Sequence, residues 1–108
     1  MILKLPERDW KRLQELRSVA LERLCERILG EVAALSAEPS LTWHERYLAT
    51  YALMQRRDGD ITEAFNNDSR SRAIVHLTAM VRMQLVTDEE LKGFSEETRE
   101  TVAHWLAD

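Results

Sequence analysis

Residues 69–86 form the most apolar stretch of the chain, and they constrain its fold more than any other feature. On a helical wheel Ile74, Leu77 and Val81 fall in one broad arc, while Val75 and Met83 fall on the other side. A helix that is apolar around most of its circumference is buried, because a surface helix shows a single apolar stripe. The segment is too short, and with three arginines too charged, to span a bilayer. We therefore expect a central helix over about 69–86, buried inside a small bundle.

Composition supports one globular domain over residues 1–108. Apolar residues make up 44 % of the chain and charged residues 31 %, which is typical of a folded domain. Only 3 glycines and 2 prolines are present, so we expect few turns and long helices. The single cysteine, Cys25, cannot form a disulfide within the chain, and the first residues lack the apolar core of a secretory signal. These features predict a cytoplasmic location without membrane insertion.

The N-terminal segment predicts a long amphipathic helix from near Pro6 to about Ser36, with apolar residues at steps of three and four. About thirty residues at 1.5 Å each would extend roughly 45 Å. This exceeds the roughly 35 Å diameter of a compact domain. The helix must therefore bend at Gly30 or extend beyond the globule, where a second copy is the commonest cover. Arg17 and Glu31 lie inside its apolar stripe, either reaching the edge or pairing across a dimer interface.

A second helix is predicted to begin at residues 42–45, Thr-Trp-His-Glu, which form a capping box, and to run to about Arg57. Trp43, Tyr47 and Tyr51 recur on one face of this helix. Such an aromatic stripe is more often core or interface than a ligand site. Arginine and aromatic residues are also enriched in interface anchors, so Arg17, Glu31, Trp43, Tyr47 and Tyr51 are our candidate interface residues.

The remaining segments predict short helices between good start and stop signals. Gly59 is expected to end the second helix, and Asp60 to cap a short helix over 61–65. Residues 87–90, Thr-Asp-Glu-Glu, form another capping box before a helix that Gly93 ends, and Ser95 caps the last helix. No strand pattern is present. The predicted fold is all-α, with five to six helices around the central one.

No combination of residues indicates catalysis or a cofactor. The three histidines are not spaced as a metal-binding pair, and one cysteine cannot complete a common structural zinc site. His76, in the apolar segment, is expected to be a core or boundary residue. Cys25 has carboxylates nearby, which disfavour a reactive thiolate. We expect neither an enzyme nor a protein with a cofactor or metal.

A second interpretation is a nucleic-acid-binding regulator. Residues 60–86 have the outline of a helix-turn-helix, with a short helix, a polar turn and a longer helix. Phosphate contacts would come from Arg56, Arg57, Arg70 and Arg72. The apolar circumference of the second of these helices and the net charge of −4 argue against it. We therefore expect first a small helical protein that binds another protein and self-associates, as a dimer.

Overall fold

The computed structural model describes residues 4–66 and 69–107, and every regular element in these ranges is helical. The all-α prediction is confirmed. Five α-helices and one short 3₁₀ helix follow one another within the described residues. Their bounds are α1 Glu7–Ser36, α2 Trp43–Phe65, the 3₁₀ helix Arg70–Arg72, α3 Ala73–Arg82, α4 Asp88–Lys92 and α5 Glu96–Leu106.

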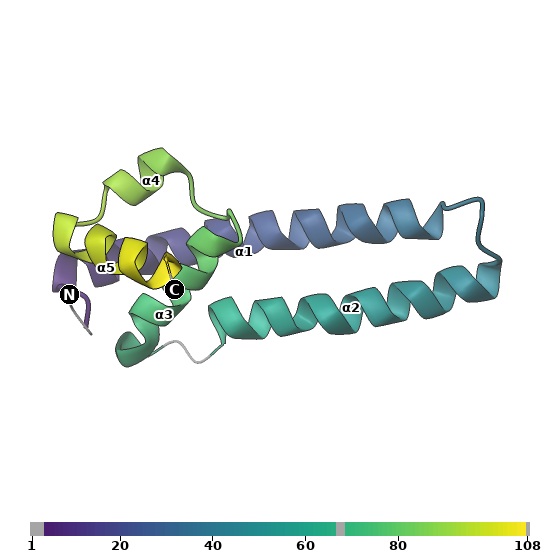
Figure 1. The fold of residues 1–108 in the computed structure, drawn as a ribbon, viewed down its shortest axis with the longest axis horizontal. Helices are drawn as coiled ribbons and strands as arrows, with labels where there is room; N and C mark the ends of the chain where they lie inside the picture. Colours follow the sequence, from purple (N-terminus) through teal and green to yellow (C-terminus); the bar gives the residue numbers. More distant parts are fainter. Residues whose placement is uncertain (1–3, 67–68, 108) are drawn as a thin grey trace.

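The two longest helices, α1 and α2, lie side by side and antiparallel as a hairpin (Figure 1). One end of the hairpin joins α3, α4 and α5 in a compact head, and the other end projects away from it. We call the projecting part, residues 25–58, the arm. The molecule therefore measures 51 × 26 × 24 Å, with the arm along its longest dimension.

Helix α1 runs through Gly30 as one helix and extends beyond the head, so the second of the two expectations for this helix is confirmed. A Cβ at Gly30 would meet no other atom within 4 Å, so this glycine serves no close approach. One side of the overhang is covered by α2 of the same chain (Figure 1). Pairing with α2 was not foreseen from the sequence.

Helix α2 is capped by Thr42 as predicted, with both hydrogen bonds of the capping box formed. The predicted end at Gly59 is wrong, and so is the separate helix over 61–65, because α2 continues without a break to Phe65. A glycine inside a helix is unfavourable by only about 1 kcal/mol. Burial of Ala64 and partial burial of Ile61 and Phe65 against the core offset that amount.

Helix α3 is the buried centre of the head, as predicted, with seven of its ten residues buried. Its bounds are shorter than the predicted 69–86. The chain enters through a 3₁₀ turn and leaves the helix after Arg82. The exit is a Schellman turn, in which the Leu85 N–H donates to the Met80 carbonyl (2.9 Å) and the Gln84 N–H to the Val81 carbonyl (2.9 Å). Leu85 and Met80 are both buried, which anchors the turn.

Gln84 carries the strain of this turn, because its φ of 60° is in the left-handed region that favours glycine. We expect Gln84→Gly to raise the free energy of unfolding by about 0.5–1 kcal/mol, since glycine removes the Cβ penalty. Urea unfolding followed by circular dichroism measures this change. Gln55→Gly, a glutamine exposed within α2, is the control and should destabilise by about 1 kcal/mol. A Gln84→Gly variant that is less stable than the wild type would contradict the claim that the backbone of Gln84 is strained.

The head is joined to α1 by buried polar contacts. The Asp9 carboxylate, buried on α1, accepts hydrogen bonds from the Ser95 N–H (3.0 Å), the Ser95 hydroxyl (2.6 Å) and the Thr98 hydroxyl (2.5 Å). Burial would raise the pKa of Asp9, but these hydrogen bonds outweigh it and hold the pKa below its usual value. Asp9 therefore ties the N-terminus of α5 to α1.

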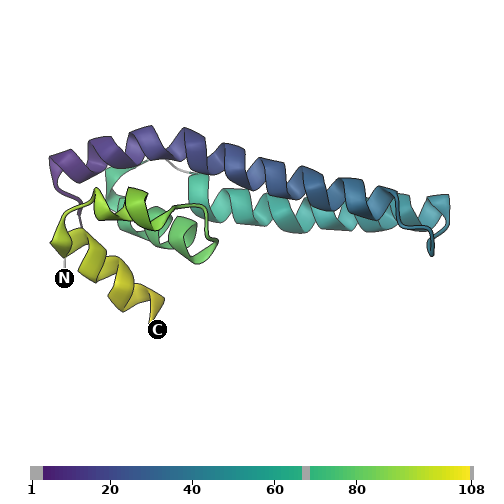
Figure 2. The ribbon, with the colours of Figure 1, turned by 90° about the horizontal axis from the view of Figure 1, so that it is seen from above.

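Helix α4 is held by Glu90, which serves two contacts at once. Its carboxylate closes the predicted capping box with Thr87 and receives both terminal nitrogens of the Arg23 guanidinium, at 2.6 and 2.9 Å. The hydrogen bonds from Arg23 lower the pKa of Glu90 to about 2. Helices α3, α4 and α5 all lie on one side of α1 (Figure 2).

Candidate protein-binding surface

Large apolar side chains are exposed along the arm. Trp43 is 79 % exposed, Tyr47 66 %, Tyr51 57 % and Leu29 62 %, and Met54 is also exposed. In the same hairpin, buried residues such as Leu24 and Ile28 show that the head end of the seam is well packed. An isolated exposed leucine needs no explanation, but a cluster of large apolar side chains marks an interaction surface.

These side chains lie on one side of the hairpin. Residues 43, 47, 51 and 54 of α2 follow one another at steps of four and three, and residues 25 and 29 of α1 are one turn apart, so each set shares a helix face. The two faces meet at a groove of about 160 Å³ that has Cys25, Leu29 and Met54 among its lining residues. We call this surface the arm face. It consists of Cys25, Leu29, Trp43, Tyr47, Tyr51 and Met54, and none of them is charged.

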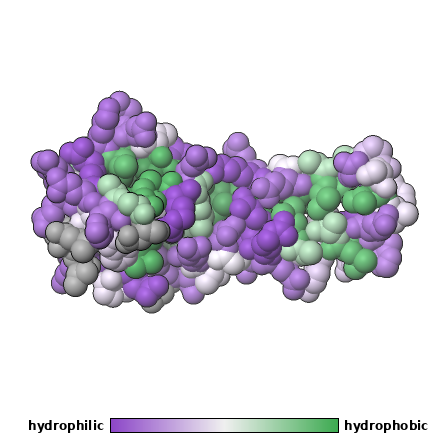
Figure 3. All heavy atoms as spheres, in the orientation of Figure 1, coloured by the Kyte–Doolittle hydropathy of each residue, from purple (hydrophilic) through white to green (hydrophobic). Residues whose placement is uncertain are grey.

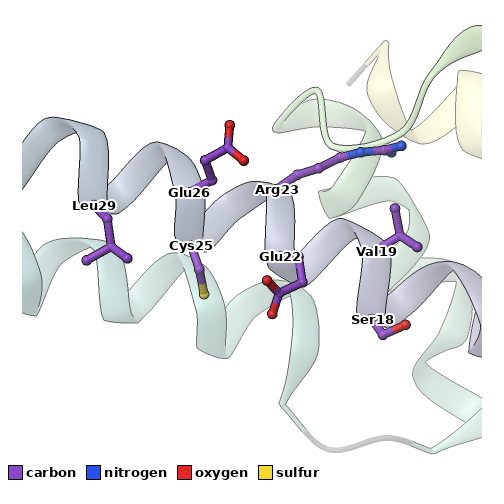
Figure 4. A pocket seen from close by; sticks show the side chains of 7 residues that line it. All are labelled: Ser18, Val19, Glu22, Arg23, Cys25, Glu26 and Leu29. Carbon is purple, nitrogen blue, oxygen red and sulfur yellow. The ribbon is translucent and has the colours of Figure 1, made fainter.

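A second hollow, of about 610 Å³, follows α1 itself, with Val19, Cys25 and Leu29 among its lining residues (Figure 4). Cys25 and Leu29 point from α1 towards α2 in this view. Here α1 is above α2 and the head is to the right, the reverse of Figure 1, so Figure 4 views the hairpin from its other side. Glu22 and Glu26 also line the hollow, so the surface becomes acidic towards the head.

The side of the arm seen in Figure 3 is also apolar over its outer half and hydrophilic nearer the head. Leu48 is another exposed large apolar side chain of the arm. It lies one turn before Tyr51, just outside the edge of the arm face that is turned away from α1. The aromatic side chains Trp43, Tyr47 and Tyr51 are all on the arm face. The arm face therefore has the better anchors for a partner.

Arg17, a candidate interface residue, makes contacts within the chain. Its guanidinium donates to the Phe65 carbonyl (2.7 Å) and lies 3.3 Å from Nδ1 of His76. His76 is buried on α3, as expected for a core histidine. Arg17 thus joins α1 to the end of α2 and to α3 in the head, away from the arm face. An interface role for Arg17 stays a prediction.

Glu31, the other charged candidate, pairs across the hairpin. Its Oε2 lies 3.1 Å from Nε of Arg57, and Nη1 of Arg57 donates to Asp60 at 2.6 Å. Asp60 therefore pairs within α2 instead of capping the predicted short helix. The Glu31–Arg57 pair helps to hold the two helices of the arm together, and an interface role for Glu31 is untested.

The four arginines proposed for nucleic-acid contact have different surroundings. Arg57 is paired as described, and Arg70 donates to Glu7 (2.6 Å) and to the Leu5 carbonyl (2.9 Å). Arg56 and Arg72 are exposed, on α2 and on the 3₁₀ helix. Two of the four charges are thus partly balanced by carboxylates of the same chain.

Sequence reasoning missed Leu29. The prediction of the N-terminal helix rests on a single apolar stripe, and Leu29 falls to one side of that stripe. Its position one turn after Cys25 is the signal that could have indicated a second, narrower apolar face. Met54 follows the aromatic residues on the same face of α2, and its neighbour on α1 in the groove is Leu29.

Within residues 4–66 and 69–107, no group of three metal-ligating side chains comes together. No helix in these ranges is long and apolar enough to cross a membrane. The fold and its surface define an all-α protein with a helical hairpin arm whose outer half exposes aromatic side chains. Comparisons with protein families, curated proteins and solved structures find no match to this chain.

Proposed function

We propose that this chain is a protein-binding module that acts through the arm face and that its partners include a second copy of itself. The observation that carries the proposal is the exposure of Trp43, Tyr47 and Tyr51 on one face of α2 in a projecting hairpin. Tryptophan and tyrosine are the residues most enriched among binding hot spots. Their location on helices, held by a capping box and by the Glu31–Arg57 pair, presents them in a preorganised arrangement.

The exposed area suits an interface. An aromatic side chain has an area of about 200 Å², so the exposed fractions of the three aromatic residues leave roughly 400 Å² per copy in water. A standard interface covers about 800 Å² on each partner. Leu29, Met54 and the residues around them supply much of the remainder. The arm face is thus large enough for the centre of a stable interface.

The six side chains of the arm face are uncharged, and this favours a second copy as partner, with Arg57 and Asp58 confined to the groove at its head end. Two identical charged surfaces repel each other when they meet across a two-fold axis, whereas an uncharged surface meets itself without that penalty. The overall net charge of −4 would favour a basic partner. The charged residues beside the arm face have both signs, with Arg46 next to Trp43 and Asp58 in the groove, so they do not favour a basic partner over a second copy.

The test is sedimentation of the protein at tens of micromolar, with the double variant Tyr47→Ser/Tyr51→Ser. We expect the wild type to be dimeric. The double variant should need at least a tenfold higher concentration to form dimers, because each aromatic side chain contributes about 1 kcal/mol or more to the free energy of association. Both tyrosines are exposed, so the helical circular dichroism signal should not change.

The matched control is Leu48→Ser, which removes an exposed apolar side chain of α2 outside the arm face. It should associate like the wild type. A wild type that remains monomeric would overturn self-association. An equal loss of self-association in the control and in the double variant would show that the arm face has no special role in dimer formation.

The nucleic-acid alternative stays an untested prediction, and the geometry adds no argument for it, since Arg57 and Arg70 are paired within the chain. For compartment we propose the reducing cytoplasm, supported by the use of a single cysteine, Cys25, which is not in a disulfide.

A further inference from the structure

The groove at the head end of the arm face is a candidate receptor for part of a second copy. It lies between α1 and α2, and its lining residues are Cys25, Ile28, Leu29, Met54, Arg57, Asp58 and Ile61. Its volume of about 160 Å³ is close to that of an apolar cavity which takes up one benzene ring. An aromatic side chain from a partner is therefore a suitable occupant.

The most exposed aromatic residue of the arm lies at the right distance to fill this groove in a partner. On α2, Trp43 is eight residues before Tyr51, or about 12 Å along the helix. The part of the groove formed by α2 is centred between Arg57 and Asp58, about 10 Å beyond Tyr51 in the other direction. The aromatic residue and the groove are thus nearly symmetric about Tyr51.

We propose that two copies pack face to face with antiparallel arms, with Tyr51 beside the two-fold axis and Trp43 of each copy in the groove of the other. This inference rests on the proposed function and specifies its homotypic complex. The four arm helices form an antiparallel bundle, in which α1 packs over α1 and α2 over α2. Tyr47, one turn from Trp43, packs against Met54 of the second copy.

The charge distribution favours this arrangement over a parallel one. With parallel arms, the acidic head ends of the two surfaces, which carry Glu22, Glu26 and Asp58, would meet each other. With antiparallel arms each acidic end meets the tip of the other copy. There Arg46, whose guanidinium carbon lies 4.3 Å from the centre of the Trp43 ring, arrives close to Asp58.

The head leaves room for a second copy. Helices α3, α4 and α5 lie on one side of α1 (Figure 2), and α3 and α5 lie in front of α1 in Figure 1. Figure 4 shows the opposite side of the hairpin, where Cys25 and Leu29 of the arm face point towards α2. A second arm can therefore lie on the arm face without meeting these helices.

Small-angle X-ray scattering of the wild-type protein distinguishes the arrangements. The monomer is 51 Å long. Because Met54 lies beside Leu29, Tyr51 is level with about Val32 of α1, so an antiparallel pair centred there extends about 75 Å. A parallel pair keeps a length close to that of the monomer. A dimer of about 75 Å supports the proposal, whereas a dimer near the monomer length overturns it and leaves the binding function intact.

The variant Trp43→Ala tests the contact itself, with Leu48→Ala as its control. Removing the ring that fills the groove should raise the dimer dissociation constant at least tenfold, and the control should change it less than twofold. Equal effects of the two variants would overturn the role of Trp43. A wild type that is monomeric at all concentrations overturns both this inference and the self-association on which it rests.

Discussion

Replacing Asp9 with alanine is expected to lower the free energy of unfolding by about 3 kcal/mol. The carboxylate accepts three hydrogen bonds from Ser95 and Thr98, and its removal leaves the Ser95 N–H and the buried Thr98 hydroxyl without this acceptor. Asp9→Asn keeps the shape of the side chain and one carbonyl oxygen, so it should lower the free energy of unfolding by less, about half as much as Asp9→Ala. Chemical unfolding of the two variants and the wild type gives both values. Equal stability of Asp9→Ala and wild type would contradict the role assigned to this carboxylate.

The same contact predicts acid sensitivity. The pKa of Asp9 is below its usual value of 3.8 in the folded protein, so its contribution is fully present above pH 3.8 and is lost as the pH falls through the folded value. Glu90, with a folded pKa of about 2, adds a loss over the range between 4.5 and about 2. Thermal unfolding at pH 7 and at pH 3 should therefore differ less in Asp9→Asn than in the wild type. An unchanged difference would contradict the Asp9 contribution.

Truncation of a buried side chain of the central helix, α3, should have the largest effect on stability. Leu77 on α3 is completely buried, and Leu77→Ala creates a cavity in the hydrophobic core, for which a loss of roughly 2–5 kcal/mol is typical. Since small domains are stable by about 5–15 kcal/mol, such a loss is a large fraction of the total. Differential scanning calorimetry or urea unfolding measures it.

Leu48→Ala provides the matched control, because it makes the same chemical change at an exposed position of the arm. We expect its effect to stay within about 0.5 kcal/mol. If the two variants lost equal stability, α3 would not be the buried centre of the fold.

Local signals in the sequence were reliable where they act through neighbouring residues. The capping boxes at Thr42 and Thr87 and the cap at Ser95 were all identified, because each depends on side chains within three residues of the cap. The breaks expected at Gly59 and after 86 were wrong for a different reason. Tertiary packing decided both, by holding α2 together through Gly59 and by anchoring Leu85 in a turn.

The candidate site was predictable only in part. The spacing of Trp43, Tyr47 and Tyr51 shows that they share a face, but spacing cannot distinguish a face that packs inside the chain from one that stays exposed. That distinction depends on which side of α2 meets α1. The same pairing decides that Arg57 reaches Glu31, and no local pattern reports a contact between residues so far apart in the chain.

One helix serves both parts of the molecule. Leu13, Leu16 and Ala20 of α1 are buried in the head, and Leu24 and Ile28 continue the same side towards the arm. Any variant that unfolds the head therefore also removes the packing that holds α1, although the aromatic side chains of the arm lie far from the substituted residue. A screen for partners should accordingly score loss of binding only in variants that keep their helical signal. Because α1 is one continuous helix, a force applied at the tip of the arm would be transmitted along it to Asp9 and, through the contact with Ser95, to α5.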